Sequence, residues 1–286
     1  MNKGDIVLIT GGSAGMGKAA AVLLAKHGAH VVILCRNKER GEKALEDIRK
    51  ETGSSEVDMM LCNLGSLESI RGFAEEFKRK YGRLNVLVNN AGVIIPGRHE
   101  TVDGFELQFG VNHLGHFLLT NLLLDALKAG APSRIVVVAS GAHKQGKIHL
   151  DDLNLTGNYN LVRAYCQSKL ANVLFTYELA ERLKGYGITA NCLHPGAVAT
   201  QMGINRSTGF GTFITRLLKP FFLTPEQGAA TSVYLAASEE VQGVSGKYFA
   251  KCRAIQSSRL SYDKELAKRL WNISEKMTGF YSVKQF

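Results

Sequence analysis

Short apolar runs alternate with longer helix-like stretches along the chain, from its first residues to about residue 250. Such alternation is typical of parallel strands joined by crossover helices, because the chain must return across the sheet before the next parallel strand begins. We expect strands at residues 6–9, 31–34, 57–61, 84–88, 134–139, 188–193 and 247–249. The run Ile135–Val138 has no polar alternation, which is typical of a strand buried on both faces. The sequence therefore predicts an α/β protein with a doubly wound parallel sheet of about seven strands.

Helices are predicted between these strands, at residues 18–27, 38–52, 67–81, 105–128, 161–184 and 225–237. Their ends carry capping signals: Ser66 and Thr224 are expected N-caps, and Gly28, Gly82 and Gly185 are expected where helices stop. No internal repeat, low-complexity tract or Pro/Ser-rich linker divides the sequence. We therefore expect one domain over residues 1–286, with helices on both faces of the sheet.

Two stretches interrupt the alternation. Residues 141–160 are polar, and residues 201–223 are apolar and contain four phenylalanines. Long excursions at one edge of a compact domain are often functional lids. We expect residues 201–223 to cover a substrate; a membrane-surface patch, a subunit contact and a simple part of the core are the other interpretations.

The composition is that of an ordinary globular protein, with 45% apolar and 21% charged residues. No run approaches the roughly 18 apolar residues of a membrane span, and a strand begins by Ile6, so we expect no signal peptide and a cytoplasmic location. The five cysteines are scattered without a Cys-x-x-Cys pair, which predicts reduced thiols. His113, His116, His143 and His194 lack metal-ligand spacing, so we expect packed or hydrogen-bonded histidines and no metal.

The chain carries a formal net charge of +10, from 35 Lys and Arg against 25 Asp and Glu. The basic residues are spread through the helical stretches and do not alternate with aromatic residues, so nucleic acid is not an expected partner. A polyanionic cofactor or a weak peripheral attraction to anionic lipid fits the same charge.

A glycine-rich turn, Thr10–Gly17, follows the first strand and opens the first helix. Gly11, Gly15 and Gly17 let the backbone approach a pyrophosphate, and the helix N-terminus supplies free N–H groups and a positive dipole. The turn also contains Ser13, Ala14 and Met16, which are expected to line the same site. An ordinary strand-to-helix turn is the alternative, but the position in an alternating chain favours dinucleotide binding in a Rossmann-like fold. The turn lacks the Gly-Lys-Ser/Thr ending of the phosphate-binding loop of nucleoside triphosphatases.

Arg36 and Asn37 follow the second strand, where an acidic residue would bind the ribose hydroxyls of NAD. An arginine can instead pair with a 2′-phosphate and stack its guanidinium near the adenine. The sequence therefore predicts NADP(H) as the cofactor. The alternative is a solvated surface arginine, because Lys38 and Arg40 make this turn basic in any case.

Tyr165 and Lys169 are four residues apart in a predicted helix, so both point from one face. A phenol has a pKa near 10, and a nearby ammonium is expected to bring that pKa toward the working pH. Ser140 stands at the carboxyl end of the buried fifth strand, where ligands of open α/β sheets collect. The three groups can therefore converge on one carbonyl or hydroxyl group.

Taken in chain order, these motifs resemble the short-chain dehydrogenase/reductase family. The matching segments are Thr10-Gly11-x3-Gly15-x-Gly17, Asn89-Asn90-Ala91-Gly92, Asn112, Ser140, Tyr165-x3-Lys169 and Pro195-Gly196, and they span essentially the whole chain. Residues 111–117, 164–172 and 194–196 are similar to the retinol dehydrogenase branch of NADP-linked enzymes. Two positions depart from the family pattern: Asn63 stands where Asp is usual, and Ala139 replaces a frequent Ser.

The resemblance implies roles for matching positions. Tyr165 would exchange a proton with the substrate, Lys169 would lower the tyrosine pKa and bind the nicotinamide ribose, and Ser140 would hydrogen-bond the reacting oxygen. Asn112 would hold a water that links Lys169 to solvent, and Asn63 would accept a hydrogen bond from the adenine amino group. The remaining expected cofactor contacts are Leu64, Asn90, Ala91, Gly92, Pro195, Gly196, Val198 and Thr200.

We therefore predict an NADP(H)-dependent oxidoreductase that interconverts an alcohol and an aldehyde or ketone on a hydrophobic, retinoid-like or lipid-like substrate. A reductase of a polar sugar or polyketide carbonyl is the alternative enzyme, and a cofactor-binding sensor without turnover is the alternative outside catalysis. The family resemblance also implies a homo-oligomer, paired through the helices at residues 112–128 and 161–184. A peripheral membrane contact is a further expectation for the basic, apolar-lidded chain.

Overall fold

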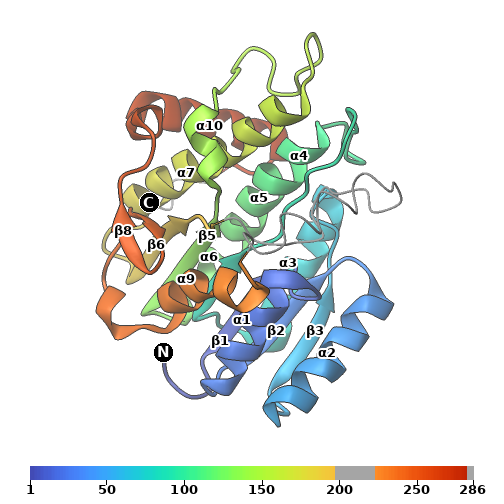
Figure 1. Cartoon of the computed structure of the whole chain (residues 1–286), viewed down its shortest axis with the longest axis vertical. Coiled ribbons are helices and arrows are strands. Elements are labelled where there is room, and N and C mark those ends of the chain that lie inside the picture. Colours follow the sequence, from blue (N-terminus) through green and yellow to red (C-terminus); the bar gives the residue numbers. More distant parts are fainter. Residues whose placement is uncertain (197–222, 282–286) are drawn as a thin grey trace.

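A computed structural model describes residues 1–196 and 223–281 of the chain. In these residues the strands form one eight-stranded sheet in the order β3-β2-β1-β4-β5-β6-β7-β8 (Figure 1). The strands are β1 (Ile6–Thr10), β2 (His30–Cys35), β3 (Val57–Leu61), β4 (Val86–Asn89), β5 (Ser133–Val138), β6 (Ile188–Leu193), β7 (Tyr248–Ala250) and β8 (Arg253–Ile255). Strands β1 to β7 pair in parallel, and β8 pairs antiparallel to β7.

The predicted doubly wound parallel sheet is thus confirmed, with one strand more than the seven that the apolar runs indicated. The additional strand, β8, has three exposed residues and therefore no apolar run that would reveal it. Strand β5 is buried along Ile135–Val138, as its lack of polar alternation predicts.

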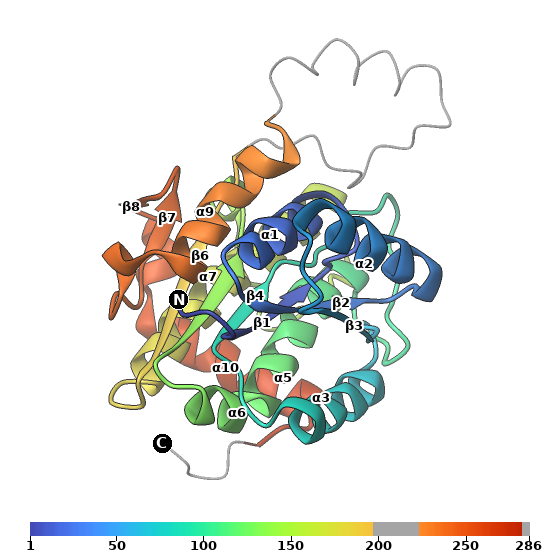
Figure 2. The same cartoon turned by 90° about the horizontal axis from the view of Figure 1, so that it is seen from below.

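Helices cover both faces of the sheet (Figure 2). On one face α1 (Gly15–Lys26), α2 (Lys38–Thr52) and α9 (Pro225–Ala237) pack in one apolar cluster with inward residues of the central strands. On the other face a second cluster includes α3 (Leu67–Tyr81), α5 (Gly115–Leu122), α6 (Leu124–Ala129), α7 (Leu161–Arg182) and α10 (Lys264–Thr278). Burial of these two apolar faces is the main favourable contribution to folding.

The capping signals of the sequence act as predicted. The Ser66 hydroxyl accepts the Ser69 N–H at 3.2 Å at the start of α3, and Thr224 forms a capping box with Gln227 at the start of α9. Gly82 ends α3 in a left-handed conformation, with φ of +68°.

One helical prediction needs correction, and one helix was not predicted. Residues 105–128 do not form one helix, because α4 (Leu107–Phe109), a π-helical turn η1 (Gly110–Leu114), α5 and α6 follow one another with breaks. The alternation was expected to end near residue 250, yet α10 follows it and packs against α7. The spacing of Leu266, Leu270 and Trp271 after an N-capping Asp263 is the signal that predicts this helix.

The strand order reverses between β1 and β4, which are neighbours although β2 and β3 lie between them in sequence. In open α/β sheets, ligands bind outside the carboxyl ends of the strands at such a switch point. In the described part of the chain, every helix is too short or too polar to cross a bilayer.

Candidate functional site

The glycine-rich turn links β1 to α1 at the switch point. Gly11 and Gly15 have φ of +68° and +53°, in the left-handed region that favours glycine. A Cβ atom on Gly17 would overlap the carbonyl oxygen of Gly11 and the side chain of Asn90, so no larger residue fits there. A Cβ atom on Gly15 would meet no other atom within 4 Å, because this glycine faces open space. The turn is therefore tight on one side and open on the other.

The first turn of α1 is suited to an anion. Its N-cap residue, Ala14, has extended backbone and no side-chain cap, and the first turn contains no acidic residue. The helix dipole and the N–H groups at this end consequently lack a protein carboxylate or hydroxyl partner. This arrangement fits the pyrophosphate of a nicotinamide dinucleotide.

Two adjoining cavities extend from the turn. One, of about 400 Å³, lies between the turn and the segment Asn90–Ile95, and the other, of about 280 Å³, includes Ser13, Asn37, Asn63 and Leu64. The first also includes Ala14, Gly15, Met16 and Gly17, and both share Gly11, Arg36, Arg40, Ala91 and Gly92. Most cofactor contacts expected from the sequence thus line one continuous region.

Arg36 and Arg40 line both cavities. In the sequence Arg40 is only a mark of a basic turn, and its place on the wall of both cavities is a finding of the structure. The Asn37 Oδ1 accepts the Arg40 N–H at 2.9 Å and so caps α2. The Asn63 Oδ1 accepts the Gly65 N–H at 3.1 Å, so one of its two lone pairs is already used by its own turn.

A buried hydrogen-bond network fixes the Asn90–Gly92 segment beside the turn. The Thr10 hydroxyl accepts the N–H groups of Asn90 at 2.8 Å and Ala91 at 2.9 Å. His116 Nε2 lies 2.9 Å from the same hydroxyl, and its Nδ1 lies 3.1 Å from the carbonyl oxygen of Asn112. Since a carbonyl only accepts, Nδ1 carries the proton and Nε2 accepts from Thr10. Burial lowers the pKa of His116 to about 4, so the ring is neutral. Sequence reasoning expected a hydrogen-bonded histidine but not this link.

Ser140, Tyr165 and Lys169 converge at the carboxyl end of β5. Ser140 follows the strand and caps the short helix η2 (Gly141–Gln145), and its side chain hydrogen-bonds Tyr165. Lys169 Nζ lies 5.8 Å from the centre of the Tyr165 ring and donates to the Val138 carbonyl at 3.0 Å. A Cβ atom on Gly92 would stand only 3.5 Å from Nζ, so the lysine borders the cavity wall.

Burial shifts the pKa of both ionisable side chains of this group. Burial raises the pKa of Tyr165, and the Ser140 hydrogen bond only partly opposes this. Burial also lowers the pKa of Lys169, to about 8. Burial has the larger effect on the Tyr165 phenol, and the lowering of the tyrosine pKa by Lys169 stays a prediction.

Asn112 lies in the π-helical turn and holds the Val93 backbone. Its Oδ1 accepts the Val93 N–H at 2.7 Å, and its Nδ2 donates to the Val93 carbonyl and to the Ser168 hydroxyl, each at 3.0 Å. The side chain therefore joins the Val93 backbone to Ser168 of α7. The water-holding role implied by the resemblance stays a prediction.

Pro195 and Gly196 follow β6 after His194, and Gly196 has φ of +84°. Val198, Thr200 and residues 201–222 of the expected lid lie outside the described residues. Among the described residues, no group of three or more His, Cys, Asp or Glu side chains could hold a metal ion.

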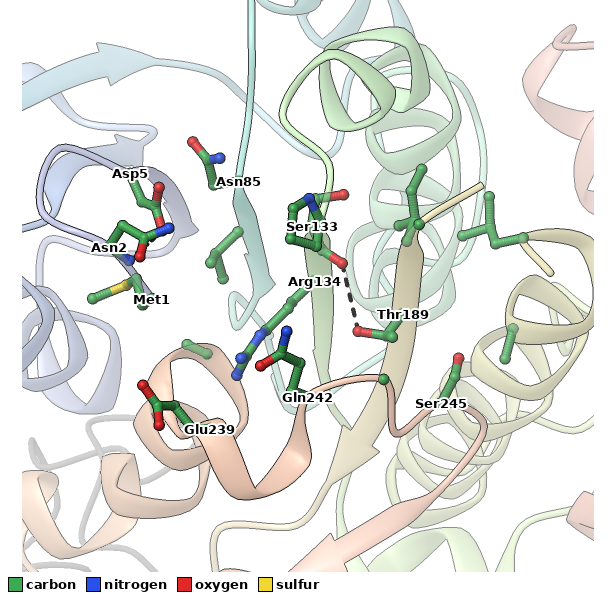
Figure 3. A pocket seen from close by; sticks show the side chains of 18 of the residues that line it. Met1, Asn2, Asp5, Asn85, Ser133, Arg134, Thr189, Glu239, Gln242 and Ser245 are labelled. Carbon is green, nitrogen blue, oxygen red and sulfur yellow. Dashed lines mark hydrogen bonds between the residues drawn. The ribbon is translucent and has the colours of Figure 1, made fainter. Parts of the chain in front are cut away.

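A separate cavity, of about 520 Å³, opens at the amino ends of β4, β5 and β6 (Figure 3). Asp5, Asn85, Arg134 and Glu239 line it, and the Arg134 guanidinium donates to the Leu235 and Ser238 carbonyls at 3.1 and 2.7 Å. This cavity is on the edge of the sheet opposite Ser140, so it is not part of the candidate site. No sequence signal predicted it.

Comparisons with known proteins agree with this arrangement. A model of the short chain dehydrogenase family matches residues 5–209. Retinol dehydrogenase 13 from Homo sapiens is 48% identical over 281 residues, which cover 96% of this chain and 85% of that protein. An uncharacterised protein from Mycobacterium paratuberculosis has a similar structure, with a TM-score of 0.78, 34% identity and coverage of 97% of this chain and 94% of that one.

The structure of actinorhodin polyketide ketoreductase with NADPH is also similar, with a TM-score of 0.68, 28% identity and coverage of 86% of this chain and 95% of that one. The fold, the glycine-rich turn and the sequence relationship all point to the same family. This chain belongs to the short-chain dehydrogenase/reductase family, in its retinol dehydrogenase branch, and is an oxidoreductase that interconverts alcohols and carbonyl compounds.

Proposed function

We propose that this protein is an NADP(H)-dependent oxidoreductase of hydrophobic alcohols and their aldehydes or ketones. The observation that carries the proposal is the convergence of the Ser140, Tyr165 and Lys169 side chains at the carboxyl end of β5, where Lys169 approaches Gly92 of the cavity wall. A proton donor, a hydrogen-bonding hydroxyl and a cation are thus held close together.

The cofactor, when bound, supplies or accepts a hydride at C4 of its nicotinamide ring. The first turn of α1 would hold its pyrophosphate, and Arg36 and Arg40 would hold a 2′-phosphate. In the reductive direction Tyr165 Oη gives its proton to the substrate oxygen while Ser140 Oγ donates a hydrogen bond to that oxygen. The raised pKa of Tyr165 keeps the phenol protonated and so available as the donor.

Lys169 affects how readily Tyr165 loses and regains its proton in the same step. Once Tyr165 has given its proton, the ammonium stabilises the phenolate that remains. In the oxidative direction the phenol must first lose its proton, and the lysine favours this loss. A pKa of about 8 leaves Lys169 mostly charged at pH 7, so the stabilising charge is present there.

The preference for NADP(H) is supported by two arginines on the cavity wall and by the absence of an acidic residue at positions 35–37. The structurally similar actinorhodin polyketide ketoreductase was solved with NADPH. Carboxylates at this position would repel a 2′-phosphate, whereas guanidinium groups pair with it.

The preference for a hydrophobic substrate is supported by the apolar side chains Val93, Ile94 and Ile95 on the cavity wall. The identity of 48% with retinol dehydrogenase 13 supports a retinoid-like or lipid-like compound. The sequence of the predicted lid, residues 201–223, contains ten Met, Ile, Leu and Phe residues, as expected of a segment that covers an apolar substrate.

The test is a substrate panel with purified protein. NADPH or NADH oxidation is followed with all-trans-retinal, decanal, a bicyclic ketone and L-sorbose. We expect the highest kcat/KM with retinal or decanal and NADPH. Faster turnover of the bicyclic ketone would favour a polyketide-like substrate, and faster turnover of L-sorbose would favour a polar sugar. Cofactor binding without any turnover would favour a sensor that is not an enzyme.

Replacement of the proposed proton donor tests the mechanism. We expect Tyr165→Phe to lower kcat by roughly 10²- to 10⁴-fold, the usual contribution of a positioned acid–base group. NADPH affinity, measured by quenching of cofactor or protein fluorescence, should change little. Retention of most activity by this variant would show that another group supplies the proton.

The homo-oligomer and the peripheral membrane contact are further proposals. Light scattering during gel filtration measures the first, and sedimentation with anionic vesicles measures the second.

A further inference from the structure

Three aromatic rings lie behind Ser140 and connect two segments of the site. Tyr248 of β7 is 1% exposed, and its ring centre lies 4.7 Å from that of His143 and 5.8 Å from that of His194. His143 stands three residues after Ser140, and His194 directly precedes Pro195. The strand pairing supports this contact, because Cys192 of β6 is the register partner of Tyr248.

His143 is held in one tautomer by its hydrogen bonds. Its Nδ1 lies 2.7 Å from the Ser140 carbonyl oxygen, and its Nε2 lies 3.0 Å from the Ser258 backbone nitrogen. The carbonyl can only accept and the backbone N–H can only donate, so the proton is on Nδ1 and Nε2 accepts. The Tyr248 hydroxyl lies 3.3 Å from the same Nδ1. The backbone of Ser140 is thus tied to the C-terminal region at a separation of more than one hundred residues.

The Ser140 hydroxyl has other hydrogen-bond partners. Its hydroxyl accepts the Ala142 N–H at 3.2 Å and also hydrogen-bonds Tyr165. Ala142 and Tyr165 thus hold the Ser140 hydroxyl, and His143 holds the Ser140 carbonyl. In the proposed function this hydroxyl faces the reacting oxygen.

His194 makes the corresponding contact on the other segment. Its Nδ1 accepts the Gly196 N–H at 3.2 Å, and its ring is stacked on Tyr248 with an angle of 25° between the planes. Tyr248 consequently touches the two histidines that hold Ser140 and Gly196. The fully buried tyrosine has no contact with the cofactor cavities among the described residues.

We propose that His143, Tyr248 and His194 form a positioning unit that fixes Ser140 relative to the Pro195–Gly196 segment. This proposal rests on the proposed function, in which Ser140 binds the reacting oxygen and the segment after β6 borders the nicotinamide. The unit sets the distance between the site of proton transfer and the site of hydride transfer. The three are positioning residues, because none of them lines the two cavities beside the glycine-rich turn.

The first test compares ring retention with ring loss. Tyr248→Phe keeps the stacked ring, and we expect its kcat to stay within threefold of wild type. Tyr248→Leu removes the ring, and we expect kcat to fall roughly 10- to 100-fold, as displacement of a reacting group by about 1 Å does. NADPH affinity should change less than threefold, because the phosphate and adenine contacts lie at the other end of the cavity. Assays use NADPH and the carbonyl compound of the panel that wild type reduces fastest.

Tyr234→Leu is the matched control. Tyr234 on α9 packs its ring against Phe249, the β7 neighbour of Tyr248, at 6.4 Å between centres, and has no contact with either histidine in the described structure. The Tyr234→Leu variant therefore measures how much kcat falls when packing against β7 is lost and the histidine contacts are kept. Equal losses of kcat in Tyr234→Leu and Tyr248→Leu, or equal losses in Tyr248→Phe and Tyr248→Leu, would overturn the proposal.

A second variant pair tests the carbonyl contact. Asparagine carries an amide N–H at the same bond distance from the backbone as His143 Nδ1, so His143→Asn retains a donor for Ser140, whereas His143→Leu does not. We expect kcat to be at least tenfold higher in His143→Asn than in His143→Leu, with similar melting temperatures. Equal kcat values would show that the ring only fills space.

The tautomer provides a readout that does not depend on turnover. In wild-type protein labelled with ¹⁵N-histidine, we expect the His143 signal, assigned by its loss in His143→Asn, to show protonated Nδ1 and unprotonated Nε2 at pH 7. A cationic ring or a proton on Nε2 would overturn the positioning geometry. If wild type reduces none of the carbonyl compounds, the proposed function fails while this measurement still decides the geometry.

Discussion

At the scale of single residues, Arg36 is the residue on which the proposed preference for NADP(H) rests. Its guanidinium and that of Arg40 line both cavities beside the glycine-rich turn. A charged hydrogen bond contributes about 1.5–3 kcal/mol, which is large enough to separate NADP(H) from NAD(H).

We expect Arg36→Ala to weaken NADPH binding by roughly 10- to 100-fold and to leave NADH binding within about threefold, because only the former has a 2′-phosphate to pair. Isothermal titration with each cofactor gives the two constants. Lys38→Ala is the control, since Lys38 is exposed, pairs with Glu42 at 3.8 Å and lines neither cavity. Equal weakening for both cofactors would remove the assignment of Arg36 to the phosphate.

Gly17 tests the tightness of the turn. We expect Gly17→Ala to weaken NADPH binding at least tenfold and to lower the free energy of unfolding by about 1–3 kcal/mol, because its methyl group would overlap Gly11 and Asn90. Gly72→Ala in α3 is the matched control: its Cβ atom would meet nothing within 4 Å, and it should raise the free energy of unfolding by about 0.5–1 kcal/mol. Urea titration and cofactor binding of both variants provide the measurements.

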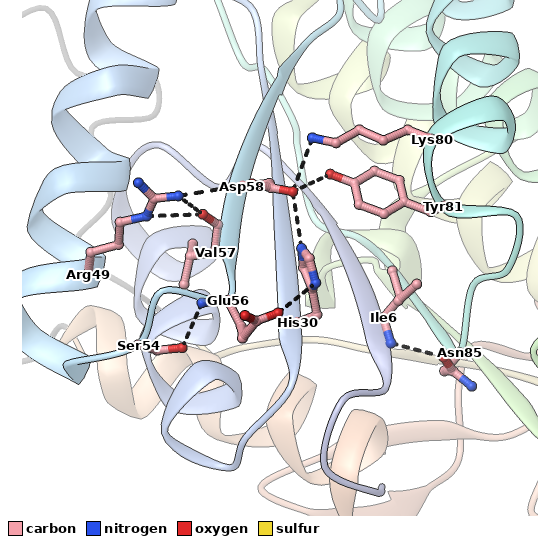
Figure 4. A network of polar contacts seen from close by, with 10 residues as sticks. All are labelled: Ile6, His30, Arg49, Ser54, Glu56, Val57, Asp58, Lys80, Tyr81 and Asn85. Carbon is pink, nitrogen blue, oxygen red and sulfur yellow. Dashed lines mark hydrogen bonds and ion pairs between the residues drawn. The ribbon is translucent and has the colours of Figure 1, made fainter.

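At the scale of elements, the edge strand β3 is stabilised by charge as well as by apolar burial. Asp58 of β3 accepts hydrogen bonds from His30 at 3.1 Å, Lys80 at 3.1 Å and Tyr81 at 2.7 Å (Figure 4). Burial alone would raise the pKa of Asp58, but these hydrogen bonds lower it to about 2. One carboxylate thereby ties β2, β3 and the end of α3 together.

We expect Asp58→Asn to lower the free energy of unfolding by about 1–2 kcal/mol at pH 7, discounted for partial exposure. A lowered pKa means that the contribution is complete above the unfolded pKa near 3.8 and is lost as the pH falls toward 2. The difference between wild type and variant should therefore shrink as the pH falls from about 4 to about 2 in urea titrations. The exposed Asp151→Asn serves as the charge-matched control, and a difference that is constant with pH would contradict the assignment.

At the scale of the whole molecule, the C-terminal helix α10 completes the core beneath the candidate site. Trp271 is 2% exposed, contacts Phe117 of α5 and Phe175 of α7, and lies under the Arg182 guanidinium at 4.2 Å. His113 of the π-helical turn hydrogen-bonds Ser274 of α10 at 2.9 Å. The helix that carries Tyr165 and Lys169 therefore rests on the last described helix of the chain.

We expect Trp271→Ala to lower the free energy of unfolding by about 3–5 kcal/mol, the usual loss for a large aromatic residue in a core. Trp271→Phe should lose less, because it keeps most of the apolar contact. Urea titration followed by circular dichroism measures both. A loss below 1 kcal/mol for the alanine variant would show that α10 is not part of the core.

The sequence predicted the elements well where local patterns determine them. The glycine-rich turn, the ends of α2, α3 and α9, and the buried run of β5 follow from spacing and capping over short windows. The four-residue interval of Tyr165 and Lys169 likewise fixes their shared helix face. Strand β8 and the breaks in residues 105–128 lack such a local signal. Helix α10 has one, in its N-capping Asp263 and the apolar spacing that follows.

The pairing of distant residues was decided by tertiary structure alone. His143 meets Ser258 across 115 positions, and His113 meets Ser274 across 161, and no periodicity encodes either contact. The same holds for the pKa of Tyr165, which depends on how much water packing removes and on where the Lys169 ammonium points. Residue types and their spacing therefore determined the family, the fold and the candidate chemistry. Packing determined which groups share a proton and which only hold the backbone, because distance and burial are properties of the folded chain.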